Sequence, residues 1–98
     1  MDPIMLTREF VSFNSASQYS NTPVAKSMAK WMRKAGMEIE ILEYQDPNGV
    51  TKTNVVGKKG KGTGGLALMG HNDTVPAEGW AWDPFKVCLL YTSPSPRD

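Results

Sequence analysis

The spacing of the apolar residues changes from a helical to an alternating period at Gly36, and this change fixes the order of the structural elements. Before Gly36 the apolar residues recur every three or four positions, as in an amphipathic helix. After it, Met37, Ile39 and Ile41 alternate with glutamates, as in a half-buried strand. The predicted buried face of the helix consists of Val24, Met28, Trp31, Met32 and Ala35, and its exposed face carries Lys26, Lys30, Arg33 and Lys34. Gly36 suits the left-handed residue that ends many helices.

A shorter helix is predicted upstream. Asp2 followed by Pro3 is typical of an N-cap with proline at the first helical position. Its predicted apolar stripe consists of Leu6, Phe10 and Phe13. Residues 14–21 are rich in Ser and Asn, which compete with helical hydrogen bonds and indicate a loop. Thr22-Pro23 repeats the cap and proline pattern, so the second helix is expected to begin there.

Downstream, the sequence predicts two more strands. Residues 46–49 read Asp-Pro-Asn-Gly, a combination that favours a tight turn. Residues 53–57 form a short strand candidate, and the apolar residues 66–69 form a third strand after a glycine-rich connection. Two helices followed by three strands predict an α/β fold, with the helices packed on a partial β-sheet.

Composition excludes several classes of function. The 98 residues are 40% hydrophobic and 21% charged, as in ordinary globular proteins, and the formal net charge is only +1. We therefore expect no nucleic acid and no anionic membrane as a partner. Cys88 is the single cysteine and receives no role, and neither a secretory signal nor a membrane-spanning run is present. The sequence predicts a cytoplasmic protein.

The stretch after the third predicted strand, Gly70-His71-Asn72-Asp73-Thr74-Val75-Pro76, contains the chain's single histidine. In extended backbone, residues two apart point to the same side, so His71 and Asp73 should face one pocket while Asn72 faces away. A carboxylate that holds one imidazole nitrogen leaves the other for a metal ion. On spacing alone, a loop histidine with Asp73 as a cap or turn residue is the favoured interpretation.

Residues 66–76, together with Gly79-Trp80 and Trp82-Asp83-Pro84-Phe85, resemble the first metal-ligand segment of one hydrolase family. This is the zinc-dependent family of aminoacylases, acetylornithine deacetylases, succinyl-diaminopimelate desuccinylases and glutamate carboxypeptidases. The resemblance covers about residues 4–86. It implies the amino-terminal part of a zinc-exopeptidase-like catalytic domain, with His71 as a ligand of one of two zinc ions and Asp73 as a catalytic-site residue. Cobalt is an alternative metal.

The resemblance also implies a reaction. It is hydrolysis of an amide bond in a small-molecule N-acyl amino acid or peptide, by a metallopeptidase-type amidohydrolase or deacetylase. A hydroxide held by two metals attacks the carbonyl, and a separate glutamate transfers the proton. A homodimer is expected only for a full-length protein. The choice among acetyl, succinyl and peptide substrates cannot be made from this sequence.

The resemblance stops after Lys86. A two-metal site needs about three protein ligands for each zinc, and the sequence after Asp73 offers no second histidine and few acidic residues. We interpret residues 1–86 as the amino-terminal part of a metallohydrolase catalytic domain and residues 87–98 as a non-family tail, most simply an assembly artefact. We expect this chain alone to lack activity. The alternative is a non-enzymatic truncated paralogue or interaction domain of the same fold.

Three other features have simpler interpretations. Residues 60–65 match the dinucleotide pattern G-x-G-x-x-G, but no helix can follow before Gly70, so we interpret them as a connection. The basic cluster of Lys58, Lys59 and Lys61 is expected to be a solvated loop. The aromatic rings of Trp80, Trp82 and Phe85 could line a substrate pocket, but we expect them to be buried and to anchor their loop.

Overall fold

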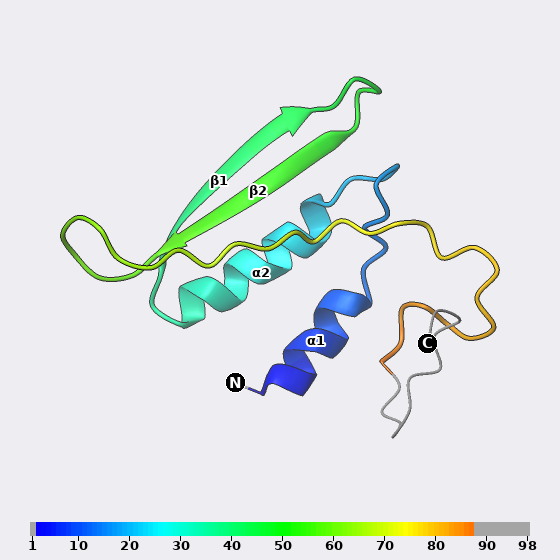
Figure 1. Cartoon of the computed structure of the whole chain (residues 1–98), viewed down its shortest axis with the longest axis horizontal. Coiled ribbons are helices and arrows are strands. Elements are labelled where there is room, and N and C mark those ends of the chain that lie inside the picture. Colours follow the sequence, from blue (N-terminus) through cyan, green and yellow to red (C-terminus); the bar gives the residue numbers. More distant parts are fainter. Residues whose placement is uncertain (1, 88–98) are drawn as a thin grey trace.

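The computed structural model describes residues 2–87, which form two helices and a two-stranded antiparallel sheet (Figure 1). The elements are α1 (Pro3–Val11), α2 (Thr22–Lys34), β1 (Glu38–Gln45) and β2 (Thr51–Lys58). Helix α2 packs on the sheet, chiefly against β2, and α1 packs on α2. The prediction of an α/β fold with helices on a partial sheet is confirmed at this level. Neither helix is long and apolar enough to cross a bilayer. Cys88 and nearly all of the predicted tail lie outside the described residues.

The ends of the helices follow from local chemistry, with one correction. Asp2 caps α1 by accepting a hydrogen bond from the Ile4 backbone N–H at 2.9 Å. Helix α2 ends as predicted. Gly36 adopts a φ of 88°, and the Met37 N–H donates a hydrogen bond to the Met32 carbonyl at 3.1 Å. At the start of α2, however, the cap position is Asn21 rather than Thr22, and the Asn21 side chain makes no capping bond. Its amide has other partners, described below.

The hairpin of β1 and β2 is set by its turn. The Asp46 carboxylate accepts hydrogen bonds from the backbone N–H groups of Asn48 and Val50, both at 2.9 Å, and Gly49 adopts a φ of 80°. The strands then pair over eight residues each, from Gln45 opposite Thr51 to Glu38 opposite Lys58. Both strands are therefore longer than predicted, because pairing extends to the ends of the turn.

The buried residues are few, and almost half of them are polar. Within the described part of the chain they are Ala16, Val24, Ala25 and Ala29, with the polar Ser15, Asn21 and Thr53. Ala25 and Ala29 were not in the predicted buried face, whose larger members Met28, Trp31 and Met32 are only half-buried. The two small alanines are 0% and 1% exposed and belong to α2, the helix that packs on the sheet. The fold therefore depends on close packing of small groups and on polar contacts.

The predicted third strand at residues 66–69 is not formed, and this is a correction. The side chains of Leu66, Leu68 and Met69 are 87%, 88% and 94% exposed. A strand that is apolar on both faces needs cover on both sides, and residues 2–87 provide none here. The segment instead has no regular secondary structure, and its trace, drawn in yellow, crosses over α2 in the view of Figure 1. Its nearest approach to sheet structure is a single parallel bridge between Ala16 and Thr74.

Helix α1 is attached to α2 through a carboxylate. Glu9 accepts hydrogen bonds from the Ser27 hydroxyl and, at 2.6 Å, from the Trp31 indole N–H. The pKa of Glu9 is lowered, first by the hydrogen bond from Ser27 and then by that from Trp31, because both favour the ionised carboxylate. Lys30 and Lys34 lie over the Trp31 ring and add positive charge nearby.

Acid should therefore loosen α1 from α2. Because the folded pKa of Glu9 lies below its ordinary value of 4.5, its contribution is complete above pH 4.5 and is lost as the pH falls through the lowered value. The Trp31 indole N–H resonance should move toward its unfolded position during an acid titration. Glu9→Gln, which carries no charge to titrate, should show no such step. An equal step in that variant would assign the change to another group.

Candidate metal-ligand segment

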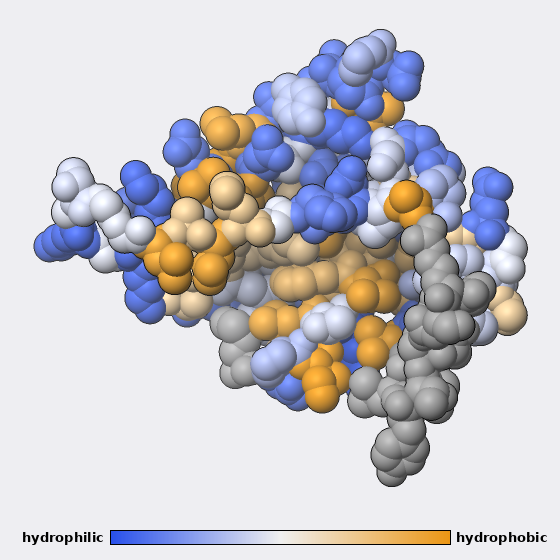
Figure 2. All heavy atoms as spheres, in the orientation of Figure 1, coloured by the Kyte–Doolittle hydropathy of each residue, from blue (hydrophilic) through white to orange (hydrophobic). Residues whose placement is uncertain are grey.

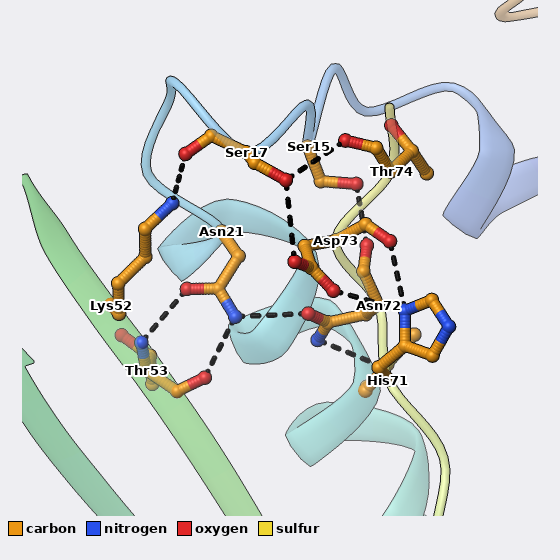
Figure 3. Close-up of polar contacts among 10 residues, drawn as sticks. Ser15, Ser17, Asn21, Lys52, Thr53, His71, Asn72, Asp73 and Thr74 are labelled. Atoms are coloured by element: carbon orange, nitrogen blue, oxygen red, sulfur yellow. Dashed lines mark hydrogen bonds and ion pairs between the residues drawn. The ribbon is translucent and has the colours of Figure 1, made fainter. Parts of the chain in front are cut away.

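His71 and Asp73 lie on the same side of an extended segment, and their side chains are in contact (Figure 3). The His71 Nδ1 atom is 2.9 Å from the Asp73 Oδ1 atom and 3.0 Å from the Asp73 backbone oxygen. The His71 side chain is 85% exposed and that of Asp73 is 50% exposed. The ring is therefore neither sealed among apolar groups nor turned away from the carboxylate.

These two contacts fix which nitrogen carries the hydrogen. A carboxylate and a backbone carbonyl only accept hydrogen bonds, so Nδ1 must be the donor to both. In the neutral ring, Nε2 then keeps its lone pair, and in Figure 3 this nitrogen points away from Asp73. An imidazole that is held through one nitrogen and open at the other has the arrangement found in metal-binding histidines.

Asn72 points to the opposite side, as predicted. Its side-chain Oδ1 atom accepts a hydrogen bond from the Asn21 amide at 2.9 Å, and its Nδ2 atom lies 3.7 Å from the Met28 sulfur. Its backbone oxygen accepts from the Ser15 hydroxyl at 2.6 Å. Asn72 is thus held on both its side chain and its backbone, and the neighbouring residues 71 and 73 are directed outward.

The loop before α2 continues this attachment along the segment. The Thr74 N–H donates to the Ser15 carbonyl at 3.0 Å, and the Ser17 N–H donates to the Thr74 carbonyl at 2.9 Å. The Ser17 hydroxyl lies 3.4 Å from Asp73 Oδ2 and 3.2 Å from the Thr74 oxygen. These contacts join residues more than fifty positions apart in the sequence.

A mainly apolar cavity of about 550 Å³ lies on the other side of the segment from the His71–Asp73 pair. Asn72 and Thr74 line it, whereas His71 and Asp73 do not. Figure 2 shows hydrophobic atoms gathered over α2 and between the two helices on this face. The pair therefore faces solvent, and the expectation that it faces a pocket is wrong for residues 2–87.

The aromatic residues after the segment also differ from prediction. Trp80 and Phe85 are 43% and 37% exposed and line the cavity, so they do not bury themselves to anchor the loop. The Trp80 and Trp82 rings lie 5.9 Å apart in a tilted arrangement. No helix follows Gly65 up to residue 87, so the condition for nucleotide binding at residues 60–65, a helix directly after Gly65, is not met.

The side chains of this segment can provide one ligand for a metal ion. The oriented imidazole of His71 fits that role, whereas no group of three or more His, Cys, Asp or Glu side chains comes together within the range that the structure describes. A catalytic zinc site requires about three protein ligands. His71 can thus supply one ligand, with Asp73 supporting it.

Sequence reasoning missed the residues that hold this segment in place: Ser15, Ser17 and Asn21. The Ser- and Asn-rich composition of residues 14–21 was a signal, but it indicated only a loop. An Asn before Thr-Pro at a helix start would ordinarily be taken as a cap, and this local interpretation hides its long-range partners.

Comparison with known proteins identifies relatives over most of the chain. It is 34% identical over 86 residues to the acetylornithine deacetylase of Vibrio campbellii, and 37% identical over 86 residues to that of Proteus mirabilis. Each match covers 86% of this chain and 22% of the relative. The acetylornithine deacetylase of Photorhabdus laumondii is 41% identical over 70 residues, which are 69% of this chain and 18% of the relative. No protein-family model and no solved structure matches.

The chain therefore spans only about a fifth of the length of these curated relatives. The region that it matches is their amino-terminal part. Homology over most of its length makes this chain a fragment-like relative of the acetylornithine deacetylase family.

Proposed function

We propose that residues 1–86 are the amino-terminal part of a dinuclear zinc hydrolase domain, in which His71 is a metal ligand and Asp73 is its catalytic-site partner. The observation that carries this proposal is the orientation of the imidazole, with Nδ1 bonded to Asp73 and Nε2 directed outward. Homology to deacetylases supports amide hydrolysis as the reaction class. The chain alone is inactive, since His71 is its single histidine.

Each residue of the pair has a defined task. His71 presents the Nε2 lone pair, and the Asp73 carboxylate holds the Nδ1 hydrogen, which fixes the tautomer and makes the ring a stronger donor to a cation. When bound, zinc supplies an activated water and polarises an amide carbonyl. The substrate class is an N-acylated amino acid, and the names of the relatives favour an acetyl group.

Zinc titration of the chain tests the pair directly. Because His71 is the single histidine, its ring proton resonances report binding without ambiguity. We expect a saturable shift with weak affinity, since one imidazole and one carboxylate form an incomplete site. Asp73→Asn should weaken binding by roughly 10- to 100-fold, as loss of an outer partner of a metal-binding histidine does.

The matched control is Glu40→Gln, which removes an exposed carboxylate from the outer face of β1. It should leave zinc binding unchanged. An amidase assay on the same samples, with N-acetylornithine and zinc, should show no turnover. If the His71 ring responds to zinc no better than free imidazole does, or if Asp73→Asn has no effect, the proposed role of the pair is wrong.

A further inference from the structure

Asn21 connects the His71 segment to the sheet. Among the described residues the segment has no backbone hydrogen bonds to β2, and Asn21 is a side chain that hydrogen-bonds directly to both. The Asn21 Oδ1 atom accepts from the Thr53 N–H at 2.8 Å. The Nδ2 atom donates to the Thr53 carbonyl at 2.8 Å and to Asn72 Oδ1 at 2.9 Å. Figure 3 shows the amide lying between β2 and the segment.

The orientation of this amide is determined by its partners. The Thr53 N–H needs an acceptor and the Thr53 carbonyl needs a donor, so a flipped amide would lose both bonds. Both Nδ2 hydrogens are used, and Asn21 is only 8% exposed. A buried amide with every donor satisfied is a rigid connection, because moving it leaves unpaired polar groups.

The rest of the loop is fixed to β2 as well. Lys52 donates from Nζ to the carbonyl oxygens of Ser17 and Tyr19 at 2.7 and 2.6 Å, and the Ser20 hydroxyl donates to the Thr51 carbonyl at 2.7 Å. The loop therefore has a defined position relative to the sheet before it contacts the segment. Ser15 and Asn21 then hold Asn72 from two directions.

From this geometry we infer that Asn21 is a positioning residue for the His71–Asp73 pair, an inference that rests on the proposed function. Successive side chains of an extended segment point to opposite sides, so holding Asn72 toward α2 places residues 71 and 73 outward. A slip of one residue would exchange the two sides and turn the imidazole inward. Asn21 thus determines which residues face the metal, although it does not touch the metal ligand.

The test compares Asn21→Ala with the matched control Asn54→Ala, which removes an exposed amide from β2, the strand that Asn21 contacts. Two readouts are needed. One is the fraction of the Nδ1–H tautomer of His71, measured by imidazole ¹⁵N shifts at a fixed alkaline pH at which the ring is neutral. The other is zinc affinity. Asn21→Ala should lower the Nδ1–H fraction and weaken zinc binding about tenfold, at the lower end of the range for supporting residues. Asn54→Ala should change neither.

Fold integrity is followed by the amide exchange of β1 and β2. If Asn21→Ala unfolds the chain, Asn72→Ala serves instead, because it removes the contact with the segment and keeps both Asn21 bonds to Thr53. The inference is overturned if the variant folds and both readouts stay within about twofold of the original chain. If the original chain binds no zinc, the proposed function fails, whereas the tautomer measurement still decides the role of Asn21.

Discussion

An acetylornithine deacetylase whose amino-terminal segment is replaced by the homologous residues of this chain should hydrolyse N-acetylornithine, and His71→Ala should nearly abolish that activity. The relative from Proteus mirabilis is a suitable host, since the match covers 86 residues at 37% identity. In the chimera the host supplies the remaining ligands. Removing a metal ligand should lower the activity by more than the roughly 10- to 100-fold that follows the loss of a supporting partner.

Asp73→Asn in the same chimera should lower kcat/KM by roughly 10- to 100-fold, because the amide keeps the shape of the carboxylate but loses the charge that holds the Nδ1–H group of His71. Glu40→Gln, remote from the segment, should leave kcat/KM unchanged. Zinc content is measured on each purified chimera. Full activity of the His71→Ala chimera would overturn the assignment, and an inactive parent chimera that folds and binds zinc would show that this segment cannot serve the reaction.

Ala25→Leu should remove a large share of the free energy of unfolding of this chain. Ala25 is fully buried, in the helix that packs on the sheet. Three added carbons have no space there, and overpacking of this kind costs about 1–3 kcal/mol. A small domain often has only about 5 kcal/mol in total, and a core of four buried apolar residues leaves little reserve.

Urea denaturation followed by far-UV circular dichroism measures the loss. The matched control is Lys26→Leu, on the exposed side of the same helix turn, which should change the free energy of unfolding by no more than about 0.5 kcal/mol. Equal stability of the two variants would show that α2 does not pack closely on the sheet.

The parts of the fold that sequence predicted are those set by neighbours in the chain. The Asp2 cap, the Asp46 turn and the end of α2 at Gly36 all rest on bonds between residues within five positions of one another. The opposite directions of Asn72 and of the His71–Asp73 pair follow from backbone geometry alone.

The predictions failed where the structure of a residue depends on partners that lie far away in the sequence. Residues 66–69 have the composition of a buried strand, but a strand needs neighbours and cover that local sequence does not specify. Asn21 was missed because its partners, Thr53 and Asn72, lie 32 and 51 positions away. The roles of His71 and Asp73 came from the family resemblance, since the spacing His-x-Asp alone favours a loop histidine beside a cap or turn residue.

The uncovered run at residues 66–69 has a consequence for the lifetime of this chain in a cell. Three large side chains are more than four-fifths exposed, and within residues 2–87 the sheet has only two strands; chaperones and proteases recognise surfaces of this kind. The molecule would be sorted by quality control as an incompletely folded protein, even though its hairpin and helices are formed. Its abundance would then depend on how quickly the exposed apolar residues 66–69 become buried against another surface.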